Sequence, residues 1–445
     1  TPNDGYYDSV NIEQFLKKGK NEISVLVWYS GKDLSFSNTD STQGGLLFEA
    51  KSEEINILSD ETWKVKKNTA YHQDNGKDQP NYRLHEYNVY YDANDEIENW
   101  QAINYDDSNW SNATEYGKGG SSPWNKLYSR GIPLLKTKEL SNYENSQEYQ
   151  NYTTTKDETI TLKVPYNCQL TPYLEIEATE GKKIRIYSEN INLGSVSATY
   201  ITKNGIQKFE SLGWINGENI TYEIPKDVKI ISLKYRESGY NTDFLGKFNS
   251  NDEFYNKLWE KSLRTLYITM RDNFMDCPDR ERAQWWGDVT IEMLMSMYSL
   301  DTDSYLLYQE GVNTMINYID KNTNVLQTVV PINNGYFELP VQQLAGLVGF
   351  WDYYLYTNDE DFIKKVYTPS LNYLLLWNIE DNLVVHRTGS WDWLDWGENI
   401  DTISLENAWY YYALSSVNNM AKLLKKEEDS KILTEKMKKI KIGYE

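Results

Sequence analysis

Cysteine and histidine are scarce in this sequence. The two cysteines, Cys168 and Cys277, lie far apart with no CxxC pair, so neither a disulfide framework nor a zinc site is indicated. The three histidines, His72, His85 and His386, do not show the spacing of a metal site, and the sequence therefore predicts no metal and no other cofactor. Since no histidine is close in sequence to Cys277, we interpret that thiol as packed rather than nucleophilic.

Positive charge and long apolar runs are also in short supply. The sequence has 45 Lys and Arg against 66 Asp and Glu, for a formal net charge of −21. Such a charge repels nucleic acid and anionic membrane surfaces, so neither is an expected partner. No stretch approaches the roughly 18 apolar residues of a membrane-spanning helix. The chain begins at Thr1 without a signal-peptide pattern, and any leader is expected outside this sequence.

Aromatic residues, in contrast, are plentiful. They make up 14% of the 445 residues, mostly as tyrosine and tryptophan, within a hydrophobic fraction of 40%. This composition indicates a folded chain, and its length indicates two to four domains. Flat aromatic faces with a polar tip suit stacking on sugars, although most of these side chains are expected in the core or on the surface.

The first half of the chain shows strand periodicity. Alternation from Ile23 to Tyr29 between turn-rich segments predicts an antiparallel β-sandwich region over residues 1–140. A polar stretch at 138–156 is interpreted as the connection that leads into a second β-sandwich domain, whose bounds we set at 141–245. Its strands are indicated by three sets of apolar residues: Ile160, Leu162 and Val164; Ile184 and Ile186; and Ile231, Leu233 and Tyr235.

From about residue 246 the apolar period becomes helical. We expect a helix from Ser250, where Ser250 and Glu253 form a capping-box pattern, and further helices at 287–300, 303–320, 340–357, 359–378, 403–425 and 427–441. Thr357 and Glu360 form a second capping-box pattern, and Pro369 is expected to interrupt its helix.

One segment between helices concentrates acids, arginines and tryptophans, namely Asp276-Cys-Pro-Asp-Arg-Glu-Arg-Ala-Gln-Trp-Trp-Gly-Asp288. Pro278 places Asp276 in a loop, whereas Glu281, Trp285 and Asp288 have the spacing of one helical face. Glycoside hydrolysis uses one protonated and one ionised carboxyl group, and these acids could supply them. A neighbouring indole and nearby acids would keep Glu281 protonated, while adjacent arginines would point away from it. The alternative is a solvated charged face with structural ion pairs.

This segment resembles the Asp-Cys-Pro-x-Arg-x-Arg…Trp-x-Gly-Asp signature of the bacterial α-L-rhamnosidases, glycoside hydrolase family 78. The resemblance extends to four further segments: Asp4-Gly-Tyr-Tyr-Asp8, Gly44-Gly-Leu-Leu-Phe48, Arg130-Gly-Ile-Pro133 and Lys234-Tyr-Arg-Glu237. It implies β-sandwich domains, the second of them concanavalin-like, ahead of an (α/α)₆ six-hairpin catalytic barrel whose first part is residues 246–445.

The resemblance also implies roles for individual residues. Asp276 matches the acid that contacts bound rhamnose, Glu281 the general acid, Asp288 a third acid of the site, and Trp285 an aromatic wall beside the sugar. Arg280 is the signature arginine expected at the substrate. The sequence departs from the family at Ala283-Gln-Trp-Trp286, where many members have Leu-Gly-Trp-Thr.

Two further loops are candidates for the sugar pocket. The run Ser390-Trp-Asp-Trp-Leu-Asp-Trp-Gly397 resembles a barrel loop of the family, and its candidate residues are Trp391, Asp392, Trp393 and Asp395. Glu338, in the loop at 335–340, is the other. For both loops, packing or structural pairing is as probable as ligand contact.

A six-hairpin barrel needs about twelve helices, and this sequence predicts about seven. The resemblance implies hydrolysis of terminal α-L-rhamnosides with inversion, with the general base in a later, missing part of the barrel, so the fragment alone would lack it. The expected partner is a rhamnose-containing oligosaccharide, polysaccharide or glycoside. Two other readings stay open: a six-hairpin glycosidase for another sugar, and a non-catalytic carbohydrate-binding protein.

Overall fold

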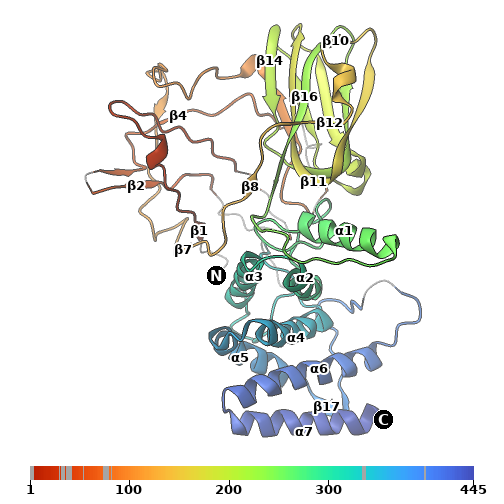
Figure 1. The fold of residues 1–445 in the computed structure, drawn as a ribbon. Coiled ribbons are helices and arrows are strands. Elements are labelled where there is room, and N and C mark those ends of the chain that lie inside the picture. The colour runs from red at the N-terminus through yellow and green to blue at the C-terminus, as the bar shows by residue number, and fades with distance from the viewer. Residues whose placement is uncertain are drawn as a thin grey trace.

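The computed structural model describes residues 5–29, 31, 36, 43–53, 55–73, 80, 81, 83–332, 337–394 and 397–444. The chain passes from an N-terminal region of short strands into a curled β-sheet and then into a stack of helices, as Figure 1 shows. No helix of the described residues is long and apolar enough to cross a membrane.

The N-terminal region contains only short elements in its described part. The strands are β1 (Gly5–Tyr7), β2 (Glu49–Lys51), β3 (Asn56–Leu58), β4 (Lys64–Val65), β5 (Val89–Asp92), β6 (Ser111–Asn112), β7 (Leu127–Ser129) and β8 (Lys136–Thr137), with short helices η1 (Glu13–Phe15) and η2 (Ala93–Asp95). The pairs β1–β7, β2–β3 and β4–β6 form three separate ladders.

The strand expected from Ile23 to Tyr29 is absent, so that prediction is wrong. Val25 and Val27 are 38% and 45% exposed, and this segment pairs with no strand of the described residues. Alternation predicts a strand only if a neighbour supplies the hydrogen bonds and covers the apolar face. The β-sandwich expected over residues 1–140 stays a prediction.

The middle of the chain forms one large curled sheet. Its strands are β9 (Ser141–Asn142), β10 (Tyr152–Thr153), β11 (Glu158–Ala178), β12 (Lys183–Ser188), β13 (Ala198–Ile201), β14 (Gly205–Glu210), β15 (Ile215–Ile224) and β16 (Lys229–Gly239), with η3 (Ser146–Tyr149) and η4 (Glu189–Leu193) between them. The strand order is β10-β16-β11-β15-β12-β13-β5, and the long strand β11 pairs with β15, β16 and β14 along its length.

The predicted strands of this part are confirmed. Ile160, Leu162 and Val164 alternate inward along β11 and pack in the buried core of the sheet. The N-terminal region also adds to this sheet, because β5 pairs in parallel with β13, with Val89 opposite Ala198. Because β5 is held in this sheet, the segment just before β5 lies at the junction with the helical domain.

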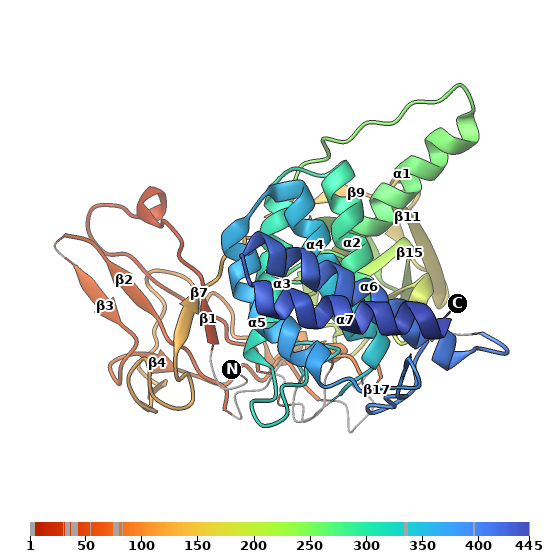
Figure 2. The same ribbon diagram turned by 90° about the horizontal axis from the view of Figure 1, so that it is seen from below.

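The helical part contains α1 (Glu253–Ile268), α2 (Trp286–Ser299), α3 (Asp303–Asn317), α4 (Pro340–Thr357), α5 (Glu360–Leu375), α6 (Thr402–Leu423) and α7 (Glu427–Tyr444), with a small hairpin of β17 (Ile379–Glu380) and β18 (Leu383–Val384). These helices confirm the predicted ones to within a few residues at each end. Helix α4 contacts α2 on one side and α6 on the other, and α7 packs on α6 at the end of the stack, while α3 and α5 lie beside these helices (Figures 1 and 2). A continuous buried core joins them.

The helix starts differ from the predicted capping boxes. Asp252, not Ser250, caps α1 by accepting a hydrogen bond from the Phe254 amide at 2.9 Å. Asp359, not Thr357, caps α5, and it does so by accepting a hydrogen bond from the Phe362 amide at 2.9 Å. Thr357 is still the last residue of α4, and an N-cap residue must lie outside the helical conformation.

Pro369 does not interrupt α5, contrary to expectation. The helix continues for six residues beyond it, and its inward face, including Val366 and Tyr373, is completely buried. Packing of that face against the core offsets the cost of the hydrogen bond that proline removes.

Candidate active site

The acidic segment at 276–285 is a loop between α1 and α2. Arg282 has φ of +52° and Trp285 is extended, so helix α2 begins only at Trp286. The prediction that Glu281, Trp285 and Asp288 share one helical face is therefore wrong. Contacts with the loop at 328–330 explain why the helix does not begin earlier. The Trp286 amide donates to the carbonyl of the loop residue Thr328 at 3.1 Å, and not to a carbonyl of its own helix.

The loop closes on itself and brings two acids together. The Asp276 amide donates to the Ala283 carbonyl at 2.9 Å, and the Ala283 amide donates back to Asp276 Oδ1 at 3.1 Å. This closure places Asp276 beside Glu281, whose side chain is 3% exposed. Burial, followed by repulsion from the Glu281 charge, raises the pKa of Asp276 to about 8. The two carboxyl groups therefore hold a proton at neutral pH.

Glu281 is surrounded by three donors. The Trp285 indole Nε1–H donates to Oε2 at 2.8 Å, Arg280 Nε lies 3.2 Å from Oε1, and the Arg83 guanidinium also pairs with Oε1. The expectation that Arg280 points away is wrong, because it assumed helical geometry. Arg83 comes from the N-terminal region, almost 200 residues earlier, and no sequence signal indicated it.

Trp285 stands in an aromatic cluster beside these acids. Its ring centroid lies 5.6 Å from that of Phe36 and 5.9 Å from that of Phe337, both in edge-on arrangements. The three rings come from three separate parts of the chain. They form an apolar wall next to the Glu281 carboxyl group, the kind of surface that packs on a sugar ring.

Asp288 lies in the first turn of α2 with its neighbour Glu292 one turn later. Glu292 is buried, which raises its pKa well above the usual value, and the charges of Asp288 and Asp276 add to the effect. Asp288 and the loop acid Asp276 therefore belong to one electrostatic cluster, because the charges of both act on Glu292. Glu292 was not predicted, although its i, i+4 spacing from Asp288 is visible in the sequence.

Arg282 faces away from the acids and anchors the loop to the β regions. Its guanidinium contacts Glu86 Oε1 at 2.8 Å and lies 3.2 Å from the ring centroid of Trp214. Burial opposes ionisation of Glu86, but the Arg282 charge overcomes it and holds the pKa of Glu86 below its usual value. The loop is therefore fixed by the N-terminal region and the sheet together.

Glu338 is occupied by structural partners. Its side chain is 2% exposed, forms two hydrogen bonds with Arg387 at 2.7 and 3.0 Å, and accepts one from the Tyr373 hydroxyl at 2.9 Å. The backbone amide of Glu338 also donates a hydrogen bond to Ser390 Oγ, in the next loop, at 3.0 Å. These contacts favour the structural reading of Glu338 over ligand binding.

The tryptophan loop lies next to the Glu338 loop and is partly open. Trp391 is 48% exposed, and its ring centroid lies 5.1 Å from that of Trp393. Asp392 Oδ2 contacts His386 Nε2 at 3.1 Å, and His386 Nδ1 contacts the buried Glu406 of α6 at 3.0 Å. Asp395, the remaining candidate of this loop, lies outside the described residues.

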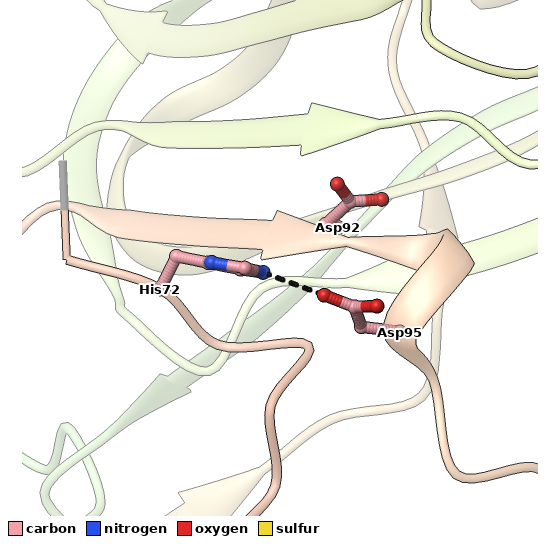
Figure 3. Close-up of side chains that lie close together, drawn as sticks. All are labelled: His72, Asp92 and Asp95. Atoms are coloured by element: carbon pink, nitrogen blue, oxygen red, sulfur yellow. Dashed lines mark ion pairs between the residues drawn. The ribbon is translucent and has the colours of Figure 1, made fainter.

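Among the residues that the structure describes, two groups of side chains have ligand atoms close enough to hold a metal ion, although the sequence spacing suggested none. One is His386 with Asp392 and Glu406; the other is His72 with Asp92 and Asp95, shown in Figure 3. In the second group His72 Nε2 pairs with Asp95 Oδ2 at 3.2 Å, while Asp92 caps η2. In both groups the histidine already pairs with a carboxylate, and neither group includes the loop acids.

The fold and this loop define a class of architecture: a domain of helical hairpins that follows a β region, with acids in the loop before its second helix. Residues 243–445 match the family described as the bacterial alpha-L-rhamnosidase 6 hairpin glycosidase domain. The resemblance inferred from the acid signature is thereby confirmed.

The relatives agree with this assignment. An alpha-L-rhamnosidase of Formosa agariphila is 23% identical over 94% of this chain, which spans 47% of that relative's length. A rhamnosidase of glycoside hydrolase family 78 from Bacillus sp. GL1 superposes with a TM-score of 0.80 over 99% of this chain and 70% of its own, at 14% identity. A Streptomyces avermitilis alpha-L-rhamnosidase complexed with L-rhamnose gives 0.68 over 89% and 38%, at 15% identity. These structural matches confirm the predicted class of fold, β-sandwich domains followed by part of an (α/α)₆ barrel.

Proposed function

We propose that this chain carries the acid side of an inverting α-L-rhamnosidase site, acting on terminal α-L-rhamnosides of a glycoside, oligosaccharide or polysaccharide. The observation that carries the proposal is the pair of half-buried Asp276 and buried Glu281, which retains a proton at neutral pH beside an aromatic wall. The whole-chain likeness to rhamnosidases supports rhamnose as the sugar. We keep the division into 1–140, 141–245 and 246–445 as part of the proposal.

The chemistry follows from the geometry of the pair. Burial and repulsion from the Glu281 charge raise the pKa of Asp276 to about 8, so the pair holds one proton at neutral pH before substrate binds. In the reaction this proton passes through Glu281 to the leaving glycosidic oxygen as the bond from that oxygen to the anomeric carbon breaks, which leaves both carboxyl groups ionised. Asp276 then holds the sugar hydroxyls, and Trp285 packs on the ring.

Inversion also requires a carboxylate that takes a proton from the attacking water on the opposite face of the sugar. Glu338, in the loop before α4, and Glu406, in α6, are two further buried glutamates of the helical part, but Arg387 holds the first and His386 the second. We therefore assign the general base to neither. The proposal places it on a helix of the barrel beyond those of this chain.

The test compares leaving groups. The 445-residue chain and a longer form of the protein are assayed with 4-nitrophenyl and 2,4-dinitrophenyl α-L-rhamnosides. In the active form, Glu281→Gln should lower kcat/KM on the nitrophenyl substrate by about 10²–10⁴-fold and far less on the dinitrophenyl one, whose leaving group needs no proton.

Asp276→Asn is the matched control. It should lose activity on both substrates to a similar degree, since it removes a sugar contact rather than the proton donor. If instead Asp276→Asn showed the leaving-group dependence and Glu281→Gln did not, the donor would be Asp276 and the assignment wrong. Hydrolysis of another aryl glycoside in preference to rhamnoside would contradict the choice of sugar, and binding of rhamnose without turnover in any form would indicate a carbohydrate-binding protein.

A further inference from the structure

A separate cavity of about 440 Å³ adjoins the acidic loop. Its wall is built from several parts of the chain, among them His85 and Glu86 before β5, the segment from Arg130 to Leu135, Trp214 of the sheet region, and the segment from Arg271 to Asn273 that leads into the loop. Arg282 also lines it, whereas neither Asp276 nor Glu281 does. The cavity is therefore distinct from the proposed catalytic pocket.

Arg271 is a cation of this wall with only neutral hydrogen-bond partners. Its guanidinium donates to Gln169 Oε1 at 2.7 Å and to Ser238 Oγ at 3.2 Å, and lies 4.7 Å from the ring centroid of Trp214. Among the described residues it forms no ion pair, although the Asp272 charge acts on it at longer range. Burial lowers the pKa of Arg271 to about 10. A buried cation without a contacting counter-ion is unfavourable, and an anion would offset that cost.

The other two arginines of the wall are already paired with carboxylates. Arg130 Nε contacts Asp8 Oδ1 at 2.9 Å, and Arg282 contacts Glu86 Oε1 at 2.8 Å. Among the described residues, Arg271 is thus the arginine of this wall without a carboxylate at contact distance.

Two buried acceptors line the same cavity. Asn273 is 8% exposed, and its Oδ1 has no hydrogen-bond partner among the described residues. The second oxygen of Glu86, Oε2, is likewise buried without one. Buried acceptors are nearly always satisfied, so this pair indicates a ligand that brings hydroxyl donors.

We propose that the cavity binds a sugar acid, with its carboxylate on Arg271 and its hydroxyl groups donating to Asn273 Oδ1 and Glu86 Oε2. The volume lies within the range of about 300–1,000 Å³ that small-molecule sites occupy. A neutral sugar would leave Arg271 uncompensated, and an inorganic anion would leave both acceptors without donors. The chemistry therefore selects a polyhydroxylated carboxylate over either.

The test is titration calorimetry on the 445-residue chain with D-glucuronate, D-glucose and sulfate at matched ionic strength. Glucuronate should bind at least tenfold more tightly than glucose or sulfate. Arg271→Gln should weaken glucuronate binding at least tenfold, and so should Asn273→Leu, which tests the site independently should the arginine variant fail to fold. Asp272→Asn, an exposed residue of the same wall, should retain binding.

Three results would overturn the proposal. The first is that glucuronate does not bind, the second is that glucose or sulfate binds as tightly as glucuronate does, and the third is that both variants bind glucuronate as tightly as the unaltered chain. None of these depends on rhamnoside hydrolysis, so the cavity and the catalytic proposal stand or fall separately.

Discussion

Two buried acid sites of the helical domain look alike in sequence and differ in structure. Glu281 and Glu338 each lie in a loop rich in aromatic residues, and each is at most 3% exposed. Glu338 accepts two hydrogen bonds from Arg387 and one from the Tyr373 hydroxyl. Glu281 also contacts two arginines, but it has in addition a second acid as its neighbour, and that neighbour retains a proton. The comparison teaches that the partner of a buried carboxyl group, rather than its burial, decides whether it suits structure or acid catalysis.

The largest effect is expected where the structural pair is broken. Arg387→Met leaves Glu338 buried without its cation and should lower the free energy of unfolding by about 3–5 kcal/mol. Urea denaturation measures it. Lys364→Met, which breaks an exposed pair with Asp361, is the control and should cost less than about 1 kcal/mol. Equal small losses in both variants would show that Glu338 does not depend on Arg387.

For the pair of Asp276 and Glu281, the free energy of unfolding should instead depend on pH. Because the pKa of Asp276 is raised to about 8 in the folded chain, the folded state holds a proton that the unfolded state releases above about pH 4. Stability should therefore fall as pH rises from 5 to 8, by at most about 4 kcal/mol from this group. Asp276→Asn should remove that slope in urea denaturation at the two pH values. A slope that is unchanged in the variant would place the retained proton elsewhere.

The indole contact is expected to matter less. Trp285→Phe keeps a ring between Phe36 and Phe337 but removes the donor to Glu281 Oε2, a bond to a charged group worth about 1.5–3 kcal/mol. Thermal unfolding at neutral pH reports the loss. Trp63→Phe, which removes an indole bond to a neutral carbonyl near the surface, should cost less than Trp285→Phe. The reverse order would mean that the Trp285 bond does not stabilise Glu281.

The smallest effect is expected at Arg280. Its side chain is 58% exposed, so Arg280→Met should change the free energy of unfolding by less than about 1 kcal/mol. Arg83→Met should cost more, because the Arg83 side chain is only 34% exposed and contacts the same Glu281 oxygen. Denaturation of the two variants side by side checks the order. A larger loss for Arg280→Met would reverse the roles assigned to the two arginines.

The sequence predicted the parts whose interactions are local. Helical spacing placed α1 to α7 correctly, and alternation placed β11, β12 and β16, because in each case one face of a regular element is buried. It failed at Ile23–Tyr29, where alternation lacks a pairing strand, and at the capping boxes, where a nearby aspartate competed successfully. The acid segment was found, but its helical geometry was not, since a long-range bond from Trp286 to Thr328 decides where α2 begins.

By itself, the sequence determined the order of β and helical parts, the likeness of residues 243–445 to a rhamnosidase family and the choice of Asp276, Glu281 and Asp288 as candidates. Only the tertiary structure decided which of these acids holds the proton, because burial and the approach of a second charge are properties of the folded chain. It also brought Arg83 to Glu281 across almost 200 residues, a contact that no local pattern encodes.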